Sequence, residues 1–66
     1  MQIQLNGEMR DVPEGLTVRR LLEHLALNPS HVAIERNLEI VPRASWDCTE
    51  LAPGDRFEIV HFVGGG

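Results

Sequence analysis

The side chains that most often do chemistry in proteins are few and scattered in this sequence. The single cysteine is Cys48, and the three histidines, His24, His31 and His61, lack the close spacing that a zinc site needs. The ten acidic residues form no obvious acid and base pair. A domain this small also rarely encloses a pocket that would activate a nucleophile. We therefore expect a chain that is not an enzyme by itself and binds no metal or cofactor.

The remaining candidate for chemistry is the run of glycines Gly64, Gly65 and Gly66. Glycine has no Cβ and retains the largest backbone freedom, so residues 64–66 are expected to form a flexible tail that fits a narrow channel. Three extended residues reach roughly 10 Å. Such a tail would let another enzyme bring the Gly66 carboxylate to ATP and convert it to an acyl-adenylate. A frayed terminus or the remnant of an engineered linker is the alternative interpretation.

A predicted strand at residues 56–63 leads directly into this tail. If Phe57 and Ile59 face the core, then Val60 and Phe62 lie on the opposite, open face of the sheet. Val60, Phe62 and Val63 would then form a docking patch for a partner beside the tail. Isolated exposed apolar side chains are common on protein surfaces, which is the alternative interpretation.

The first half of the sequence predicts a hairpin followed by a helix. Residues 2–5 and 8–12 are expected to form strands, because Asn6-Gly7 between them suits a type I′ turn. The helix is expected to begin after Thr17, a suitable N-cap, and to end at Asn28-Pro29. Its apolar positions follow the spacing i, i+3, i+4 and i+7 and share one face: Val18, Leu21, Leu22 and Leu25.

The second half predicts two short strands and then the long one, at residues 32–35, 39–41 and 56–63. The turn between the two short strands is imperfect, because Leu38 stands where glycine would suit better. The segment 43–51, around Trp46, is expected to be irregular.

This order of elements is typical of an α+β fold, the β-grasp or ubiquitin-like fold, in which one main helix covers one face of a small mixed sheet. In that fold the first and last strands lie side by side and parallel at the centre. We expect the β-grasp domain to span residues 1–63 and the tail to span residues 64–66. The expected core consists of apolar side chains from the helix and the sheet: Ile3, Leu5, Val18, Leu21, Leu22, Leu25, Val32, Ile34, Phe57 and Ile59.

The charge and hydropathy of the chain argue against nucleic-acid and membrane partners. The net charge is −4, and the six basic residues, all arginines, are spread along the chain instead of forming a basic run. No apolar run approaches the ~20 residues that span a bilayer. The first residues lack the features of a signal peptide, and a lone thiol fits a reducing compartment. These features predict a cytoplasmic protein.

Several segments of the sequence match a known family. The most specific are Val32-Ala33-Ile34-Glu35-Arg36-Asn37, Ile40-Val41-Pro42-Arg43 with Trp46, Gly54-Asp55-Arg56 leading into Glu58-Ile59-Val60, and Phe62-Val63-Gly64-Gly65-Gly66. With these segments the whole chain resembles the ThiS family, the sulfur carrier proteins of thiamine biosynthesis. The final diglycine is shared by all ubiquitin-like carriers, so the middle segment distinguishes this family from the others. Leu38 departs from the small residue expected after Asn37.

The resemblance implies a carrier cycle with three partners. An adenylyltransferase related to ubiquitin-activating enzymes would activate the Gly66 carboxylate with MgATP, while Gly64 and Gly65 thread its active site. A persulfide sulfur donor would then displace AMP and leave a thiocarboxylate at Gly66. Thiazole synthase would take this sulfur into the thiazole ring of thiamine.

Other functions remain open from the sequence. Related carriers serve molybdopterin synthesis or tRNA thiolation, and they are less similar through residues 32–46. A ubiquitin-like modifier is another alternative, although a chain without lysine cannot form lysine-linked chains of itself. A non-covalent β-grasp interaction domain is a third, and it should tolerate the loss of Gly65 and Gly66, whereas a carrier should not.

Overall fold

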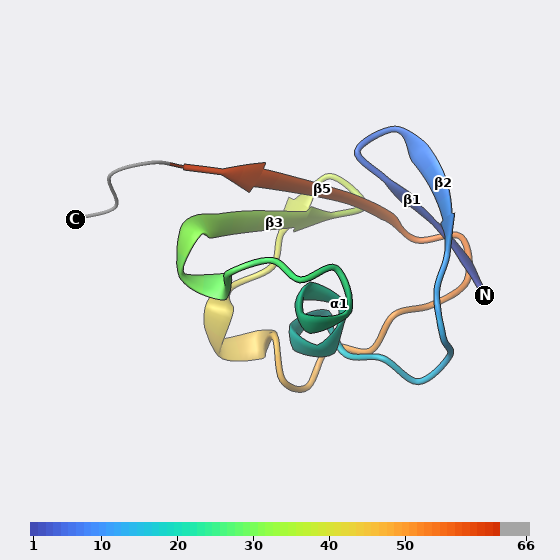
Figure 1. Cartoon of the computed structure of the whole chain (residues 1–66), viewed down its shortest axis with the longest axis horizontal. Helices are drawn as coiled ribbons and strands as arrows, with labels where there is room; N and C mark the ends of the chain where they lie inside the picture. The colour runs from blue at the N-terminus through green and yellow to red at the C-terminus, as the bar shows by residue number, and fades with distance from the viewer. Residues whose placement is uncertain (63–66) are drawn as a thin grey trace.

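In residues 1–62, which a computed structural model describes, five strands form one mixed sheet and one α-helix covers one of its faces (Figure 1). Two short 3-10 helices lie at Pro29–His31 and Arg43–Ser45. No helix in this part of the chain is long and apolar enough to cross a membrane. The main elements are β1 (Gln2–Leu5), β2 (Glu8–Asp11), α1 (Val18–His24), β3 (Val32–Arg36), β4 (Glu39–Ile40) and β5 (Arg56–His61).

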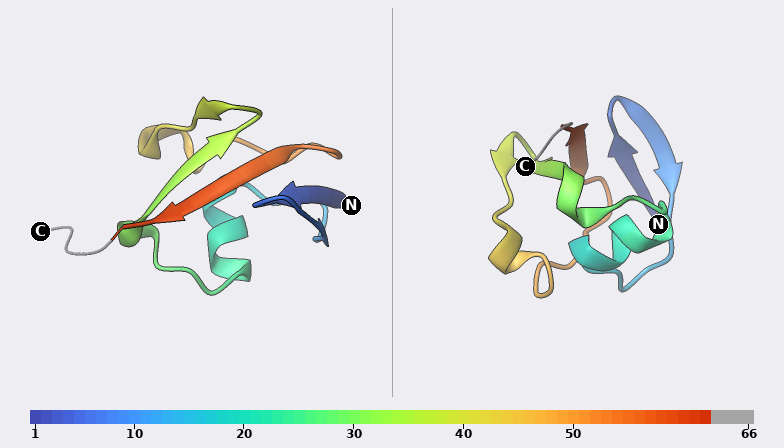
Figure 2. Two further views of the ribbon diagram at one scale, coloured as in Figure 1. Left: turned by 90° about the horizontal axis from the view of Figure 1, so that it is seen from above. Right: turned by 60° about the vertical axis from the view of Figure 1, so that its left-hand side comes forward.

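The strand order is β2-β1-β5-β3-β4, with β5 in the middle of the sheet. β5 runs parallel to β1 and antiparallel to β3, and each of these two partners forms an outer hairpin, with β2 and β4 respectively. Figure 2 shows the two hairpins on either side of β5, with α1 below them. The predicted β-grasp topology is therefore confirmed, including the parallel pairing of the first and last strands.

Both hairpins turn through two residues with left-handed backbone conformations. In the first, Asn6 has φ 49° and Gly7 has φ 84°, as the type I′ prediction requires. In the second, Asn37 has φ 52° and Leu38 has φ 72°. Leu38 therefore adopts a conformation that disfavours a side chain, and its own side chain is largely exposed.

The helix begins as predicted and ends earlier than predicted. The Thr17 hydroxyl accepts a hydrogen bond from the Arg20 N–H at 3.2 Å, which confirms the N-cap. The stop predicted at Asn28 is wrong, because the left-handed residue is Ala26, with φ 58°. Ala26 N–H donates to Glu23 C=O and Leu27 N–H to Leu22 C=O, the two bonds of a Schellman ending.

Two consequences follow from this early end. Leu27 turns back and packs against the core, which offsets the cost of a left-handed alanine. Asn28 takes a different role, since its side chain accepts a hydrogen bond from Ser30 N–H at 2.9 Å and caps the 3-10 helix Pro29–His31. Asn28 and Pro29 therefore begin the next helix instead of ending α1.

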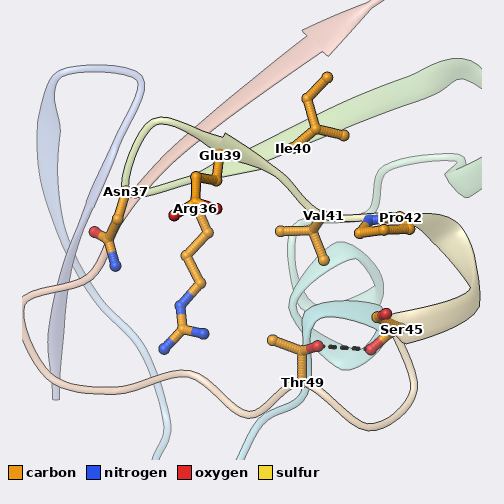
Figure 3. A pocket seen from close by; sticks show the side chains of 8 residues that line it. All are labelled: Arg36, Asn37, Glu39, Ile40, Val41, Pro42, Ser45 and Thr49. Atoms are coloured by element: carbon orange, nitrogen blue, oxygen red, sulfur yellow. Dashed lines mark hydrogen bonds between the residues drawn. The ribbon is translucent and has the colours of Figure 1, made fainter.

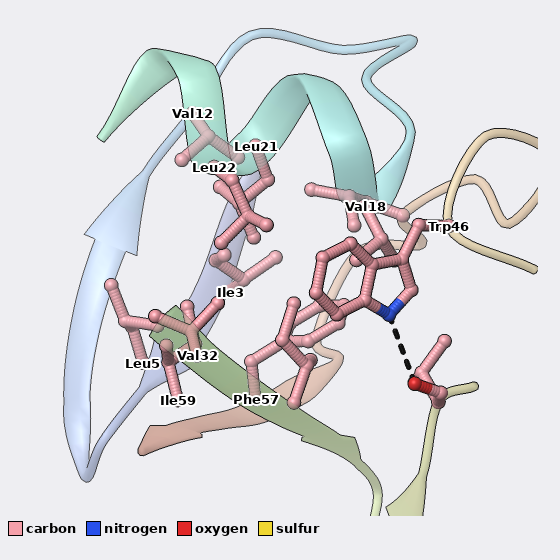
Figure 4. Close-up of a cluster of buried hydrophobic side chains, with 13 residues drawn as sticks. Ile3, Leu5, Val12, Val18, Leu21, Leu22, Val32, Trp46, Phe57 and Ile59 are labelled. Carbon is pink, nitrogen blue, oxygen red and sulfur yellow. Dashed lines mark hydrogen bonds between the residues drawn. The ribbon is translucent and has the colours of Figure 1, made fainter. Parts of the chain in front are cut away.

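One apolar core lies between α1 and the sheet (Figure 4). Nine of the ten predicted core residues are buried, and the tenth, Leu25, is partly buried against them. The sequence analysis missed four members of this core: Val12, Val41, Trp46 and Leu51. The largest is Trp46, which is 1% exposed and donates its indole N–H to the Val41 C=O at 2.9 Å.

Two arginines contact the Trp46 ring, and one of them, Arg19, belongs to α1. The guanidinium groups of Arg43 and Arg19 lie 4.7 Å and 5.5 Å from the centroid of the Trp46 ring. Arg19 also pairs with Asp47 at 3.1 Å. An arginine in the first turn of α1 is unfavourable for the helix dipole, and these tertiary contacts offset that cost.

The one buried ionisable side chain in residues 1–62 is Asp55, which precedes β5. Its carboxylate accepts hydrogen bonds from Arg36 Nε at 2.9 Å, from Asn37 Nδ2 at 3.2 Å and from Ala52 N–H at 2.8 Å. Burial alone would raise the pKa of Asp55. The hydrogen bonds and the Arg36 charge outweigh burial and hold this pKa below its usual value.

The lowered pKa of Asp55 predicts an acid-dependent loss of stability. Asp55→Asn should lower the unfolding free energy at pH 7 by about 1–3 kcal/mol, because the charged acceptor is lost. A depressed folded-state pKa adds stability above the unfolded value of 3.8, and this contribution disappears as the pH falls through the folded pKa. Urea unfolding at pH 7 should therefore give a lower unfolding free energy for Asp55→Asn than for wild type. In acid, this difference in free energy should be smaller. A difference that stays constant with pH would contradict this role.

Candidate functional site

The candidate site is the end of β5 and the chain that follows it. β5 runs through the centre of the sheet toward the end of the molecule opposite the N-terminus (Figure 1). Phe62 continues the pairing with the neighbouring segment, because its N–H donates to His31 C=O at 3.0 Å. Val63, Gly64, Gly65 and Gly66 lie outside the described residues, so their predicted roles stay predictions.

The two faces of β5 are assigned correctly by the sequence pattern. Phe57 and Ile59 are buried beneath α1, whereas Val60 is 56% exposed and Phe62 41% exposed. Val60 lies opposite Ala33 of β3, which is also exposed. The described part of the predicted docking patch is therefore an accessible apolar surface at the base of the tail.

The His61 side chain, at the end of β5, is exposed. It borders a hollow of about 230 Å³ that is also lined by Leu25, Leu27 and Ile59. The early end of α1 at His24 leaves this part of the sheet uncovered by helix.

Carboxylates lie beside the apolar patch on the open face. Glu58 of β5 stands directly opposite Glu35 of β3. Neither forms an ion pair within residues 1–62. Like charges that face each other across two strands repel, and the nearby basic side chain on this face is Arg56, two residues before Glu58.

Two asparagines from the hairpin turns hold β5 in register. β1 ends at Leu5, whereas β5 continues to His61, so part of the β5 backbone has no strand partner on that side. The Asn6 side chain replaces the missing strand: Ile59 N–H donates to its Oδ1 at 2.8 Å and its Nδ2 donates to Ile59 C=O at 3.3 Å.

Asn37 makes a similar contact at the start of β5. Its N–H donates to Arg56 C=O at 2.7 Å, and its Oδ1 accepts from Arg56 N–H at 3.0 Å. In the sequence, Asn6 and Asn37 are recognisable only by their positions between two predicted strands. Their side-chain amides could not be assigned to β5 before the topology placed both turns beside this strand.

A second hollow, of about 290 Å³, lies beside β4 and contains the Arg36 side chain (Figure 3). Two of its polar side chains already have partners within residues 1–62. Arg36 pairs with Asp55, and the Thr49 hydroxyl donates to Ser45 C=O at 2.7 Å. These contacts indicate a structural role for Arg36 and Thr49.

No three histidine, cysteine, aspartate or glutamate side chains in residues 1–62 lie close enough together to hold a metal ion. Cys48 is exposed, and its thiol lies 3.4 Å from Ser45 C=O. The arrangement instead offers a rigid strand with an apolar patch at its end.

The sequence from residue 3 to residue 66 matches the model of the ThiS family. The chain belongs to the ThiS family. It is 40% identical over 65 residues to the sulfur carrier protein ThiS of Bacillus subtilis, covering 97% of this chain and 98% of that protein. The crystal structure of a ThiS thiamine biosynthesis protein from Geobacter metallireducens superposes with a TM-score of 0.87 at 35% identity, with full coverage of both chains.

Other relatives of this ThiS family member are longer proteins. The chain is 46% identical over all 66 residues to a thiazole synthase of Paramagnetospirillum magneticum. It spans about one fifth of the length of that protein, and the same holds for a thiazole synthase of Magnetococcus marinus at 42% identity. A segment similar to the whole chain therefore occurs within larger proteins named as thiazole synthases.

The asparagine contact to β5 can be tested by hydrogen exchange. Asn6→Gly keeps the left-handed turn and removes the side chain, so the Ile59 amide should lose protection, because its only acceptor in the described structure is Asn6 Oδ1. Asn6→Asp is the matched control, since it keeps that acceptor and loses only the donor. Equal protection of Ile59 in wild type and Asn6→Gly would contradict the assignment.

Proposed function

We propose that this chain is a sulfur carrier protein of thiamine biosynthesis and that the carboxylate of Gly66 is the group that carries sulfur. The observation that best supports this is the alignment over 98% of the Bacillus subtilis sulfur carrier ThiS, which is no longer than a single β-grasp domain of this kind. The described structure adds a second support, because the central strand ends in an accessible surface where the tail begins.

The proposed chemistry activates a carboxylate that is otherwise inert to nucleophiles. A Gly66 carboxylate oxygen attacks the α-phosphorus of ATP, pyrophosphate leaves, and an acyl-adenylate forms. The terminal sulfur of a protein persulfide then attacks the acyl carbon and AMP leaves. A thiol cleaves the resulting S–S bond and releases the thiocarboxylate. MgATP is bound by the activating partner, and the carrier supplies only the tail, in which Gly64 and Gly65 leave room for a narrow active-site channel.

The partners in this proposal are an adenylyltransferase related to ubiquitin-activating enzymes, a persulfide donor and thiazole synthase. The thiazole synthase link is supported by the relatives of that name that contain a segment similar to this chain. Joining two proteins in one polypeptide raises their effective concentration, which benefits proteins that must meet.

The proposed docking patch consists of Val60, Phe62 and Val63 on the open face of the sheet. Val60 and Phe62 are accessible, and the carboxylates Glu35 and Glu58 lie on the same face. A complementary partner surface has an apolar pocket surrounded by basic side chains. Association with such a surface should slow as salt concentration rises, because the charges lie at its exposed rim.

The chemistry predicts a specific change of mass at Gly66. Incubation with the cognate adenylyltransferase, MgATP and a persulfide donor should replace one oxygen by one sulfur at the Gly66 carboxylate. Intact-mass and C-terminal peptide spectrometry would locate this change. Deleting Gly65 and Gly66 should abolish it, because the shortened tail no longer reaches the adenylation site.

Cys48→Ser is the control for this experiment, because Cys48 is the one thiol of the chain and is exposed. This variant should load as fully as wild type. Sulfur found on Cys48, or a Cys48→Ser protein that does not load, would mean that the thiol is the carrier and the proposed mechanism is wrong.

The docking patch predicts that Phe62→Asp weakens partner binding without unfolding the domain. The side chain is partly exposed, so the circular dichroism spectrum should be unchanged, while affinity for the adenylyltransferase or for thiazole synthase should fall about tenfold or more. Leu38→Asp is a matched control, because Leu38 is exposed in the turn before β4 and aspartate tolerates its left-handed backbone. Unchanged affinity of Phe62→Asp for both partners, measured by calorimetry, would count against the patch.

A further inference from the structure

The outer edge of β2 has no strand partner in the described part of the chain. β2 is the last strand on its side of the order β2-β1-β5-β3-β4, and all four of its residues are exposed. Edge strands are often protected by their shortness, by charged side chains, by proline or by a bulge. β2 has the first two of these protections, because it is four residues long and three of its residues are charged. β2 contains no proline, pairs with β1 residue for residue without a bulge, and belongs to a chain without lysine.

The hydrogen-bond pattern of the hairpin determines which backbone groups β2 presents at this edge. Val12 N–H donates to Met1 C=O, and the Met1 amino group donates to Val12 C=O, both at 2.8 Å. Bonded and non-bonded pairs alternate along an antiparallel ladder. Arg10 and Glu8 are therefore bonded to β1, whereas Met9 and Asp11 direct their N–H and C=O groups away from it.

The side chains of β2 are complementary to a second copy of β2. In an antiparallel pair with a two-fold axis at Met9, Glu8 of each copy stands opposite Arg10 of the other. Glu8 and Arg10 make no ion pair within residues 1–62. The third charged residue, Asp11, would stand opposite Gly7 of the other copy and meet no like charge.

The outward backbone groups of β2 and the charges of Glu8 and Arg10 both favour a two-fold axis at Met9. The outward N–H and C=O of Met9 would bond to those of Met9 in the second copy. The adjacent pair, Glu8 with Arg10, is then a non-bonded pair, in which opposing side chains come closest. If the axis passed through Glu8 or Arg10 instead, the backbone groups at the axis would be ones that already bond to β1. They could not bond to the second copy.

We propose that the chain associates with a second copy of itself by antiparallel pairing of the two β2 strands about Met9. The pairing joins two five-stranded sheets into one continuous sheet. It involves the four residues of β2 and Gly7 in each copy, far fewer than the roughly 20–30 residues per partner of a standard interface, so the dimer is weak. β1 separates β2 from β5, so the open face of β5 stays accessible in the dimer. The inference goes beyond the proposed carrier function and does not depend on it.

Charge reversal gives a direct test, because both residues are exposed and neither contributes to the core. Sedimentation equilibrium at concentrations up to about 1 mM should show a reversible monomer–dimer equilibrium for wild type. Glu8→Arg should weaken the dimer about tenfold, since it places two arginines opposite each other, and Arg10→Glu should do the same with two glutamates. A mixture of the two single variants should dimerise, because each reversed charge faces its opposite.

Hydrogen exchange tests the backbone part of the proposal. The Met9 amide should gain protection as protein concentration rises, whereas the Arg10 amide, already bonded to β1, should not change. Met9→Pro removes the outward N–H without breaking the β1 pairing and should abolish the dimer. A protein that stays monomeric at about 1 mM, or a dimer that is insensitive to Glu8→Arg and Met9→Pro, would overturn the proposal.

Discussion

The structure depends on satisfying the backbone of β5. A strand at the centre of a sheet must find partners for its N–H and C=O groups on both sides, because buried backbone groups without partners are costly. β3 meets this need along the whole of one side. β1 meets it only near the start of β5, and the Asn6 amide bonds to Ile59 where β1 has already ended. A side chain from a turn thus extends the pairing of the central strand beyond the end of β1.

The need to pair buried polar groups also applies to Asp55, which lies at the other end of β5. A carboxylate here is buried, and it is stable only because Arg36, Asn37 and Ala52 all donate to it. These donors come from the β3–β4 hairpin and from the loop before β5, so Asp55 joins two segments distant in sequence. Asn37 links this cluster to the strand, since it bonds both Asp55 and the Arg56 backbone.

Local patterns in the sequence predicted the elements, and tertiary contacts determined where the predictions failed. Periodicity located the helix and β5 because their apolar positions fall on one face, which is a property of the element alone. Trp46 was not assigned to the core because its segment has no periodicity, and its burial depends on Arg43 and the Val41 carbonyl. The end of α1 was misplaced for the same reason. A left-handed Ala26 is unfavourable locally and is stabilised only by the packing of Leu27, which no local rule describes.

The candidate site was partly predictable, because alternation along β5 separates its faces without any knowledge of the fold. Phe57 and Ile59 contribute to the core, whereas Val60 and Phe62, a few residues further along the same stretch of chain, contribute to the open surface. A slip of one residue in register would exchange these faces, burying Val60 and exposing Ile59. Hydrophobic burial opposes such a slip, and so do the bonds from Asn6 to Ile59 and from Asn37 to Arg56, which exist in one register only. The contacts that stabilise the sheet therefore also determine which side chains are presented at the base of the tail.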